Sequence, residues 1–293
     1  MRRQRGVALL VVMALLLVLA GVVGGFALDA HVTALQASAQ QQRLQLEQAA
    51  EGGIEAAAAR LLAADPRRRP VPDGRVQVLD GGEGIRIEVR IIDESGKLDL
   101  NIAEFTLIAR FLQQFVPNAE EAAALAAAIV DWRDPDDLIG PAGGAEAREY
   151  RAAGLPWGPA NRPFATVAEL QRVLGMRPAL FRSVRPYLTV HTGLPQPNPA
   201  FADRPLLLAL GLPPVFVEEL LVARSALQPG MPPPLLAGGF VLATAGTGTY
   251  SISSRATRAD GPGAEIHATV RVGAGGFLGQ VYTPLSWRHG HQD

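Results

Sequence analysis

The sequence predicts an α+β protein in which a long N-terminal transmembrane and amphipathic helix packs on a small antiparallel sheet, and a large all-helical insertion interrupts that sheet. Three observations predict this class. An uncharged apolar run near the start of the chain continues into a proline-free, helix-forming segment. Alternating apolar and polar runs of strand type occur at residues 76–92 and again after residue 240. A block of helical patterns lies between them.

The first element follows three arginines, Arg2, Arg3 and Arg5, and a single glycine, Gly6. The uncharged run from Val7 to Leu28 would form a helix about 33 Å long, enough to cross a hydrocarbon core of about 30 Å. A cleaved secretory signal has an apolar region of only about 7–15 residues. The run therefore favours a retained anchor over a secretory signal cut near residues 37–39, which is the alternative.

The helix is expected to continue beyond the membrane. Residues 29–64 contain no proline and are rich in Ala, Leu, Gln and Glu. Gly52 and Gly53 are the weak point of this pattern, and Asp65 and Pro66 should end it. Because arginines stay on the cytoplasmic side, the chain should be a single-pass protein of the inner membrane with its bulk in the periplasm.

The remaining elements divide into a sheet and an insertion. We expect residues 65–103 and 238–293 to form the sheet domain, with strands at 76–79 and 85–92 in the first part. Residues 104–237 should form the inserted helical domain. Its strongest helix is "EEAAALAAAIVDW", and "VAELQRVLGM" and "PLLLALGLPPVFVEELLVARSAL" are shorter helix–glycine–helix patterns.

Composition limits the possible functions. The 293 residues are 48% apolar, which is sufficient for substantial cores. A net charge of −1 argues against a dedicated nucleic-acid binder, because phosphate binding requires a basic face. The chain has no cysteine, so disulfides, thiol nucleophiles and thiolate metal sites are excluded.

An acidic cluster inside the expected insertion suggests a calcium site. Oxygen ligands on a flexible, glycine-rich loop suit calcium, which takes six to eight oxygens. The spacing is not that of an EF-hand. The alternative is a solvated acidic loop in which Asp131 and Glu146 cap helices. The cluster consists of Asp131, Asp134, Asp136, Asp137, Glu146 and Glu149.

Other candidate sites are weaker. His289 and His291 lie at the C-terminus, where fraying is the simpler interpretation. The helix–glycine turns at 173–176 and 208–212 resemble DNA-binding hairpins but have few basic neighbours. The sequence also lacks a nucleophile elbow and a phosphate loop, so no enzyme is expected. The possible catalytic side chains Ser253, Ser254, Asp260 and His267 lie on expected strands or turns without such a motif.

The N-terminal segment resembles the class III signal of type IV pilins and type II secretion pseudopilins. The resemblance implies that a prepilin peptidase cuts after Gly6 and that the new N-terminus, Val7, is methylated. It also implies that the same helix serves as membrane anchor and as the packing core of a filament. In one respect the chain departs from the pattern: the family's glutamate at the fifth mature position is replaced by Val11.

Three further stretches resemble the minor pseudopilin K family of type II secretion, which typically lacks this glutamate and carries a large helical insertion. They are "DESGKLDLNIA" (93–103), "IVDWRDPDDLIGPAGGAEAREY" (129–150) and "RPFATVAELQRVLGM" (162–176). An Asn-Val-Asn-Thr-type segment of relatives is degraded here to "QPNPAF", with Asn198 alone. Family features can therefore be assigned to this sequence least securely around residues 195–205.

The resemblance implies a non-enzymatic subunit at the tip of the pseudopilus, which helps to nucleate the filament and to export folded proteins across the outer membrane. Its partners would be the I-type and J-type minor pseudopilins, the major pseudopilin, the prepilin peptidase and the inner-membrane secretion platform, with no nucleic acid. A single-pass, membrane-anchored periplasmic binding module that escapes the peptidase is the alternative. The implied structural calcium ligands are Asp134, Asp136, Asp137, Glu146 and Glu149.

Overall fold

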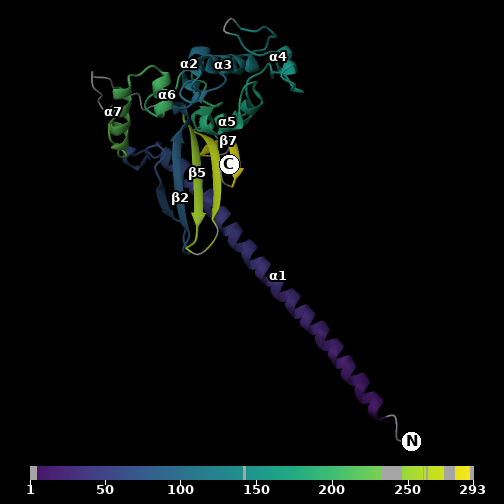
Figure 1. Ribbon diagram of the computed structural model, residues 1–293. Helices are drawn as coiled ribbons and strands as arrows, with labels where there is room; N and C mark the ends of the chain where they lie inside the picture. The colour runs from purple at the N-terminus through teal and green to yellow at the C-terminus, as the bar shows by residue number, and fades with distance from the viewer. Residues whose placement is uncertain are drawn as a thin grey trace.

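The computed structural model describes residues 5–140, 143–232, 246–259, 261, 263–273 and 281–290. A single helix, α1 (Arg5–Leu61), projects far from a two-part head, as Figure 1 shows. The part of the head next to α1 is a sheet, and a group of short helices covers the end of the sheet away from the N-terminus. The expected α+β architecture, with a long apolar helix, an antiparallel sheet and a helical insertion, is confirmed.

The C-terminal third of α1 is the part that packs against the head. Its buried side chains recur at helical spacing, while the helix before Leu44 is exposed along its whole length. The helix runs through Gly52 and Gly53 without a break, although the sequence suggested that the two glycines would weaken it there. The buried residues of α1 are Leu46, Ala50, Ile54, Ala57 and Ala58.

Gly53 is required by the closeness of the helix and the sheet. A Cβ atom at this position would lie 2.2 Å from Ser254 Oγ and 2.8 Å from Ile87 Cγ2. A Cβ atom at Gly52 would meet nothing within 4 Å. One glycine of the pair is therefore a contact point, and the other is an unconstrained helix position.

The sheet has five antiparallel strands in the order β1-β2-β5-β6-β7. Side chains alternate between a face that packs on α1 and a polar face, as a half-buried antiparallel sheet requires. The apolar face includes Ile87, Val89, Ile91, Ile252 and Ile266. The strands are β1 (Gln77–Asp80), β2 (Arg86–Asp93), β5 (Thr249–Thr257), β6 (Ala264–Val272) and β7 (Tyr282–His289).

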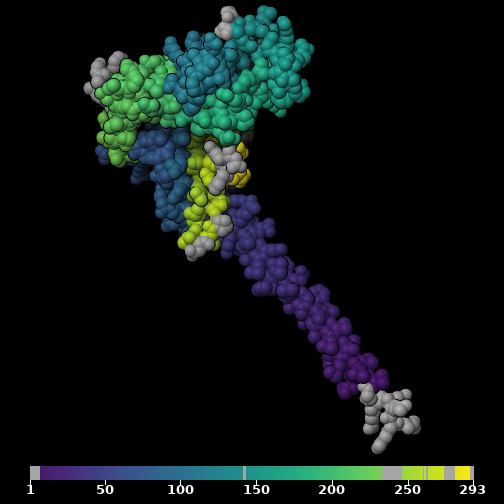
Figure 2. Space-filling view, in the orientation of Figure 1, coloured from purple at the N-terminus to yellow at the C-terminus, as the bar shows by residue number. Residues whose placement is uncertain are grey.

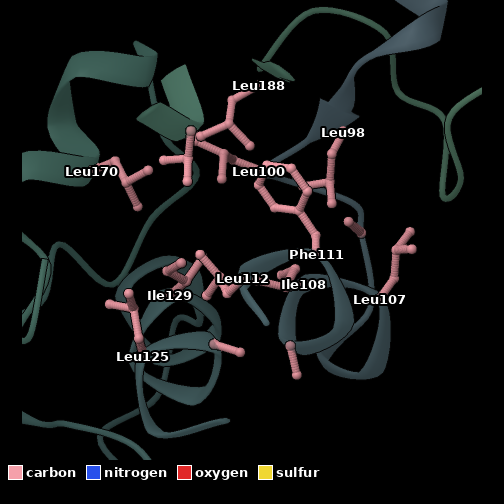
Figure 3. Packing of buried hydrophobic residues seen from close by; sticks show 14 of the residues in the cluster. Leu98, Leu100, Leu107, Ile108, Phe111, Leu112, Leu125, Ile129, Leu170 and Leu188 are labelled. Carbon is pink, nitrogen blue, oxygen red and sulfur yellow. The ribbon is translucent and has the colours of Figure 1, made fainter. Parts of the chain in front are cut away.

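The insertion has its own hydrophobic core, centred on Phe111 and Ile129 (Figure 3). Two short strands, β3 (Leu98–Asp99) and β4 (Leu188–Thr189), pair in parallel at its base. Its α-helices are α2 (Phe105–Leu112), α3 (Ala119–Arg133), α4 (Ala147–Ala152), α5 (Pro178–Val184), α6 (Arg204–Ala209) and α7 (Pro214–Ser225). The 3₁₀ turns of the head are η1 (Pro66–Arg68), η2 (Glu94–Gly96), η3 (Val167–Arg172) and η4 (Arg185–Tyr187).

The insertion begins before residue 104, which is the boundary expected from the sequence. Leu98, Leu100 and Ala103 are buried in the core of the insertion, because β3 pairs with β4 and not with the large sheet. The "VAELQR" segment forms the 3₁₀ turn η3 rather than an α-helix. These differences arise from tertiary contacts that local patterns do not encode.

A buried polar group joins the sheet to the insertion. The Glu94 carboxylate pairs with Lys97 and accepts a hydrogen bond from Ser251 Oγ on β5 at 2.5 Å. Burial raises the pKa of Glu94, but Lys97, Ser251 and Thr189 together hold it below its ordinary value. The ionised carboxylate is therefore stabilised by partners from both parts of the head.

Two residues that follow Lys97 in the chain, Asp99 and Asn101, hold neighbouring loops of the insertion. Asp99 Oδ2 accepts hydrogen bonds from the backbone N–H groups of Thr192 and Gly193 at 2.9 and 2.8 Å. Asn101 donates to the Phe164 carbonyl at 3.0 Å and accepts from the Phe164 N–H at 2.7 Å. The stretch "DESGKLDLN" (93–101), which we call the polar joint, thus connects the sheet to the insertion through side-chain hydrogen bonds and an ion pair.

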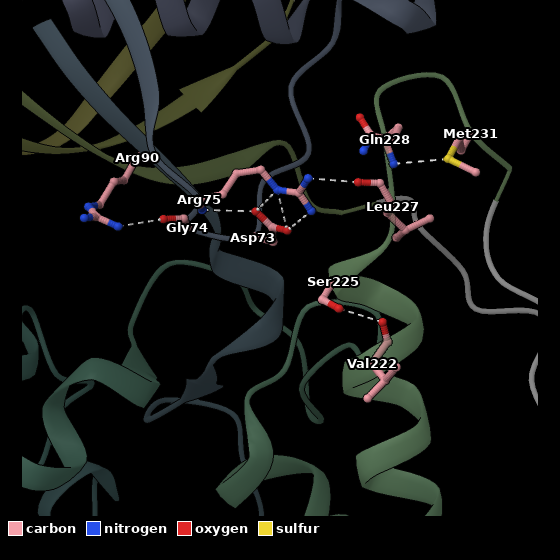
Figure 4. Close-up of polar contacts among 9 residues, drawn as sticks. All are labelled: Asp73, Gly74, Arg75, Arg90, Val222, Ser225, Leu227, Gln228 and Met231. Carbon is pink, nitrogen blue, oxygen red and sulfur yellow. Dashed lines mark hydrogen bonds and ion pairs between the residues drawn. The ribbon is translucent and has the colours of Figure 1, made fainter.

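The chain returns from the insertion beside the segment that precedes β1. Figure 4 shows Arg75, which pairs with Asp73 and donates to the Leu227 carbonyl at 2.9 Å. Close packing continues at Gly230, where a Cβ atom would lie 2.8 Å from Arg67 Cγ. Both ends of the insertion are therefore fastened to the sheet domain.

Replacement of Gly53 by alanine should lower the free energy of unfolding by about 1–3 kcal/mol, because the new methyl group overpacks the contact with Ser254 and Ile87. The control, Gly52→Ala, should raise it by about 0.5–1 kcal/mol, because alanine restricts the unfolded chain and meets no neighbour. Denaturant titration of the full chain in detergent measures both. Equal effects of the two variants would contradict the packing role of Gly53.

Candidate functional site

The most extensive candidate site is the exposed apolar half of α1. The described chain holds one helix long and apolar enough to cross a membrane, and none of its most apolar window is buried. Val7 is 63% exposed and Val11 is 61% exposed. This much free apolar surface needs lipid or other helices around it. Figure 2 shows how far the segment extends beyond the head.

The expected cleavage point lies at the start of this helix. The backbone of Gly6 is helical in the uncleaved chain, one residue after α1 begins. Arg2 and Arg3 lie outside the described residues. No charged side chain occurs between Val7 and Leu28, so Val11 has no acidic substitute within the apolar segment.

The acidic cluster occupies the loop between α3 and α4. Asp131, on the last turns of α3, accepts a hydrogen bond from Ala145 N at 2.9 Å. Gly144, with φ +155°, leaves room for that carboxylate, since a Cβ atom there would lie 1.8 Å from Asp131 Oδ2. Glu149 Oε2 accepts from the Glu146 N–H at 3.1 Å and so caps α4. Pro141 and Ala142 lie outside the described residues.

The loop's other carboxylates are mostly turned to solvent and to local partners. Asp136 Oδ1 accepts from the Leu138 N–H at 2.8 Å, and Asp137 Oδ1 accepts from Asn161 at 2.8 Å. Asp134 is the C-cap residue of α3. These bonds shape the loop without neutralising its charge.

Glu146 is the exception in this cluster. It is only 5% exposed, and beyond the capping-box contact with the Glu149 N–H its carboxylate oxygens have no hydrogen-bond partner. Burial raises its pKa to about 7, assisted by the negative charges of Asp131, Asp137, Asp136 and Asp134 in that order. A buried carboxylate surrounded by like charges is an arrangement that a cation would stabilise.

The cluster fits a hard cation in the chemistry of its donors and in its uncompensated charge. In the part of the chain that the structure describes, however, no three acidic or histidine side chains are grouped closely enough to hold a metal ion. Calcium binding would have to draw the carboxylates of the 134–137 turn towards Glu146. Asp131 acts as a support of the loop through its bond to Ala145.

The weaker candidates have structural explanations where the structure describes them. Ser254 is fully buried beneath Gly53. His267 Nε2 lies 3.1 Å from Glu265 Oε1 on the polar face of the sheet. His289 ends β7, whereas His291 and Asp260 lie outside the described residues. Gly175 and Gly211, at the two hairpin-like turns, have φ values of +85° and +87°, which accounts for glycine there.

Without added metal, the full chain should become less stable as the pH rises through about 7. The folded-state pKa of Glu146 lies above its ordinary value of 4.5, so its stabilising contribution is complete below 4.5 and is lost as the pH passes 7. Glu146→Gln cannot ionise and should flatten this part of the profile, while the exposed control Glu120→Gln should retain it. Thermal melts from pH 4 to 9 would refute the assignment if all three proteins gave the same slope.

Residues 93–193 match the family model described as type II secretion system (T2SS), protein K. No curated protein matches the chain. A chain of the crystal structure of the GspK-GspI-GspJ complex from the enterotoxigenic Escherichia coli type 2 secretion system has the same fold, with a TM-score of 0.63 and 16% identity. The match covers 88% of the present chain and 100% of that chain.

The matched residues run from the polar joint at Asp93, through the acidic loop, to the Asp99-bound turn at Gly193. The long helix and sheet around them agree with the fold of the solved relative. Residues 93–193 are therefore similar to the type II secretion system protein K family, and the chain shares the fold of the solved GspK-GspI-GspJ complex chain.

Proposed function

We propose that the protein is a structural, non-enzymatic subunit at the tip of the type II secretion pseudopilus. The observation that carries this proposal is the exposed apolar half of α1 beneath a head of the protein K type. In this proposal residues 7–28 hold the protein in the inner membrane, with the arginines in the cytoplasm and the head in the periplasm. After extraction from the membrane, the same surface packs against the helices of other subunits.

Position at the tip is supported by Val11 and by the insertion. A subunit inside the filament would need a carboxylate near the N-terminal ammonium group of its neighbour, because an unpaired charge in apolar surroundings is costly. Val11 supplies none. The insertion also makes the head much broader than the α1 rod (Figure 2), which hinders repetition along a thin fibre. Both features suit a subunit with no neighbour above it.

The partners in this proposal are the I-type and J-type minor pseudopilins first, and then the major pseudopilin. The similar fold comes from a complex of GspK with GspI and GspJ, which supports association with subunits of those types. The exposed surface from Leu35 to Leu44 of α1 would provide the contact nearest the head. Assembly of these subunits would nucleate the filament that exports folded proteins across the outer membrane.

Calcium belongs to the proposal as a structural ion of the acidic loop. Asp134, Asp136, Asp137 and Glu146 would hold it, with Glu149 as a further donor. The ion would supply positive charge beside Glu146, whose buried carboxylate is surrounded by like charges. It would fix the loop and the adjoining exposed side chains Leu138 and Ile139, which are 74% and 48% exposed, as a contact surface.

Coexpression with a prepilin peptidase should give a mature chain that begins with N-methylated Val7, detected by intact-mass spectrometry. Gly6→Leu should retain Met1, because the peptidase cuts after glycine. The control Gly24→Leu should be processed normally, since nothing lies within 4 Å of a Cβ atom at that position. An intact Met1 in the wild type, or a cut near residue 39, would favour the unprocessed membrane-anchored binding module instead.

Calcium should raise the melting temperature of the full chain at pH 8, because a ligand that binds only the folded state stabilises it. Asp136→Asn should abolish most of this rise, since asparagine keeps an oxygen for the Leu138 N–H but removes the charge. Glu120→Gln should leave the rise unchanged. A melting temperature that does not respond to calcium in the wild type would leave the loop as an acidic surface.

A further inference from the structure

The face of the sheet opposite α1 carries a hollow of about 540 Å³. Its floor consists of short polar side chains, including Ser253, Thr269 and Ser286. Its rim carries three exposed arginines, Arg90, Arg255 and Arg288, on three different strands. Long cationic side chains around a floor of hydroxyl groups form a surface suited to anions.

Strand register brings the residues of this hollow together. Arg90 on β2 faces Ser253 on β5, Ser253 faces His267 on β6, and His267 faces Arg288 on β7. The four residues thus form one row across the sheet, although they are far apart in the sequence. The two arginines lie three strand spacings apart, or about 14 Å between backbones.

The lining of the hollow has three arginines and one acidic residue, Glu265, which faces Arg255 across the β5–β6 ladder. Glu88 pairs with Arg86 at 3.1 Å, and Glu265 lies 3.1 Å from His267. Within the described residues, Arg255 and Arg288 have no carboxylate partner, and Arg90 donates only to the Gly74 carbonyl at 3.2 Å. Burial and then the charge of Arg288 lower the pKa of nearby Arg185. The face therefore has an excess of positive charge in a chain whose net charge is −1.

We propose that this hollow binds an acidic polypeptide segment of a partner protein. The arginines are too widely spaced for one small anion to contact both ends of the row. An extended chain rises about 3.3 Å per residue, so carboxylates four residues apart would span the row. The hollow and α1 lie on opposite faces of the sheet, so subunits that pack through α1 in the proposed filament would leave the hollow accessible. That accessibility rests on the proposed function, whereas binding itself does not.

The test measures binding of fluorescein-labelled octaglutamate to the unassembled full chain in non-ionic detergent by fluorescence anisotropy. Binding should weaken as salt rises from 10 to 150 mM, because the Debye length falls from about 30 to about 8 Å. Arg90→Gln and Arg288→Gln should each weaken binding about threefold to fivefold, and together about tenfold. Labelled octaglutamine should not bind.

Arg151→Gln is the matched control, because Arg151 is also exposed but lies on α4, away from the sheet in Figure 1. An equal loss with this variant would mean non-specific attraction and would overturn the proposal. Unchanged binding in the double variant would overturn it as well. Displacement by inorganic phosphate, at an ionic strength where sodium chloride leaves the peptide bound, would assign the hollow to a small anion instead. Failure of filament assembly has no effect on this measurement.

Discussion

The pairing of β2 with β5 is the constraint on which the rest of the head depends. These two strands are adjacent in the sheet, yet the Ser251–Glu94 bond that joins their ends links residues 157 positions apart. The sheet can close only if the insertion brings its two ends together. Glu94, Lys97 and Ser251 secure one side of this closure, and Arg75 with the Leu227 carbonyl secures the other. The polar joint thus stabilises the sheet and sets the position of the insertion on it.

The long helix meets two different requirements along its length. Near its C-terminus it must approach the sheet closely, and Gly53 and small alanines allow this. Towards its N-terminus it is apolar and exposed on all sides, which suits a helix surrounded by lipid or by other helices. The transition occurs without a kink or a proline. One continuous element therefore transmits the position of the head directly to the membrane segment.

Much of the fold could be predicted from the sequence, because long elements have strong local signals. The uncharged run, the alternating strands and the alanine-rich helix α3 were all recognisable. Gly52 and Gly53 looked like a weak point, because only the packed structure shows the contact with Ser254. The pair β3–β4 was missed because two-residue strands have no local pattern. The acidic residues were visible as a cluster, but nothing local distinguished the buried Glu146 from its exposed neighbours. The arginine-rimmed hollow depends on strand register across the insertion and could not be seen at all.

Asp93 and Tyr250 face each other at the end of the β2–β5 ladder, where the insertion leaves the sheet and returns to it. Two antiparallel strands whose ends meet in this way can be connected by a hairpin turn of two to five residues. The helical block therefore occupies the place of a simple turn. Its own core allows its sequence to diverge without disturbing the sheet, provided that the motif at residues 93–101 is kept. The head is thus a small sheet with a second folding unit in the position of one loop.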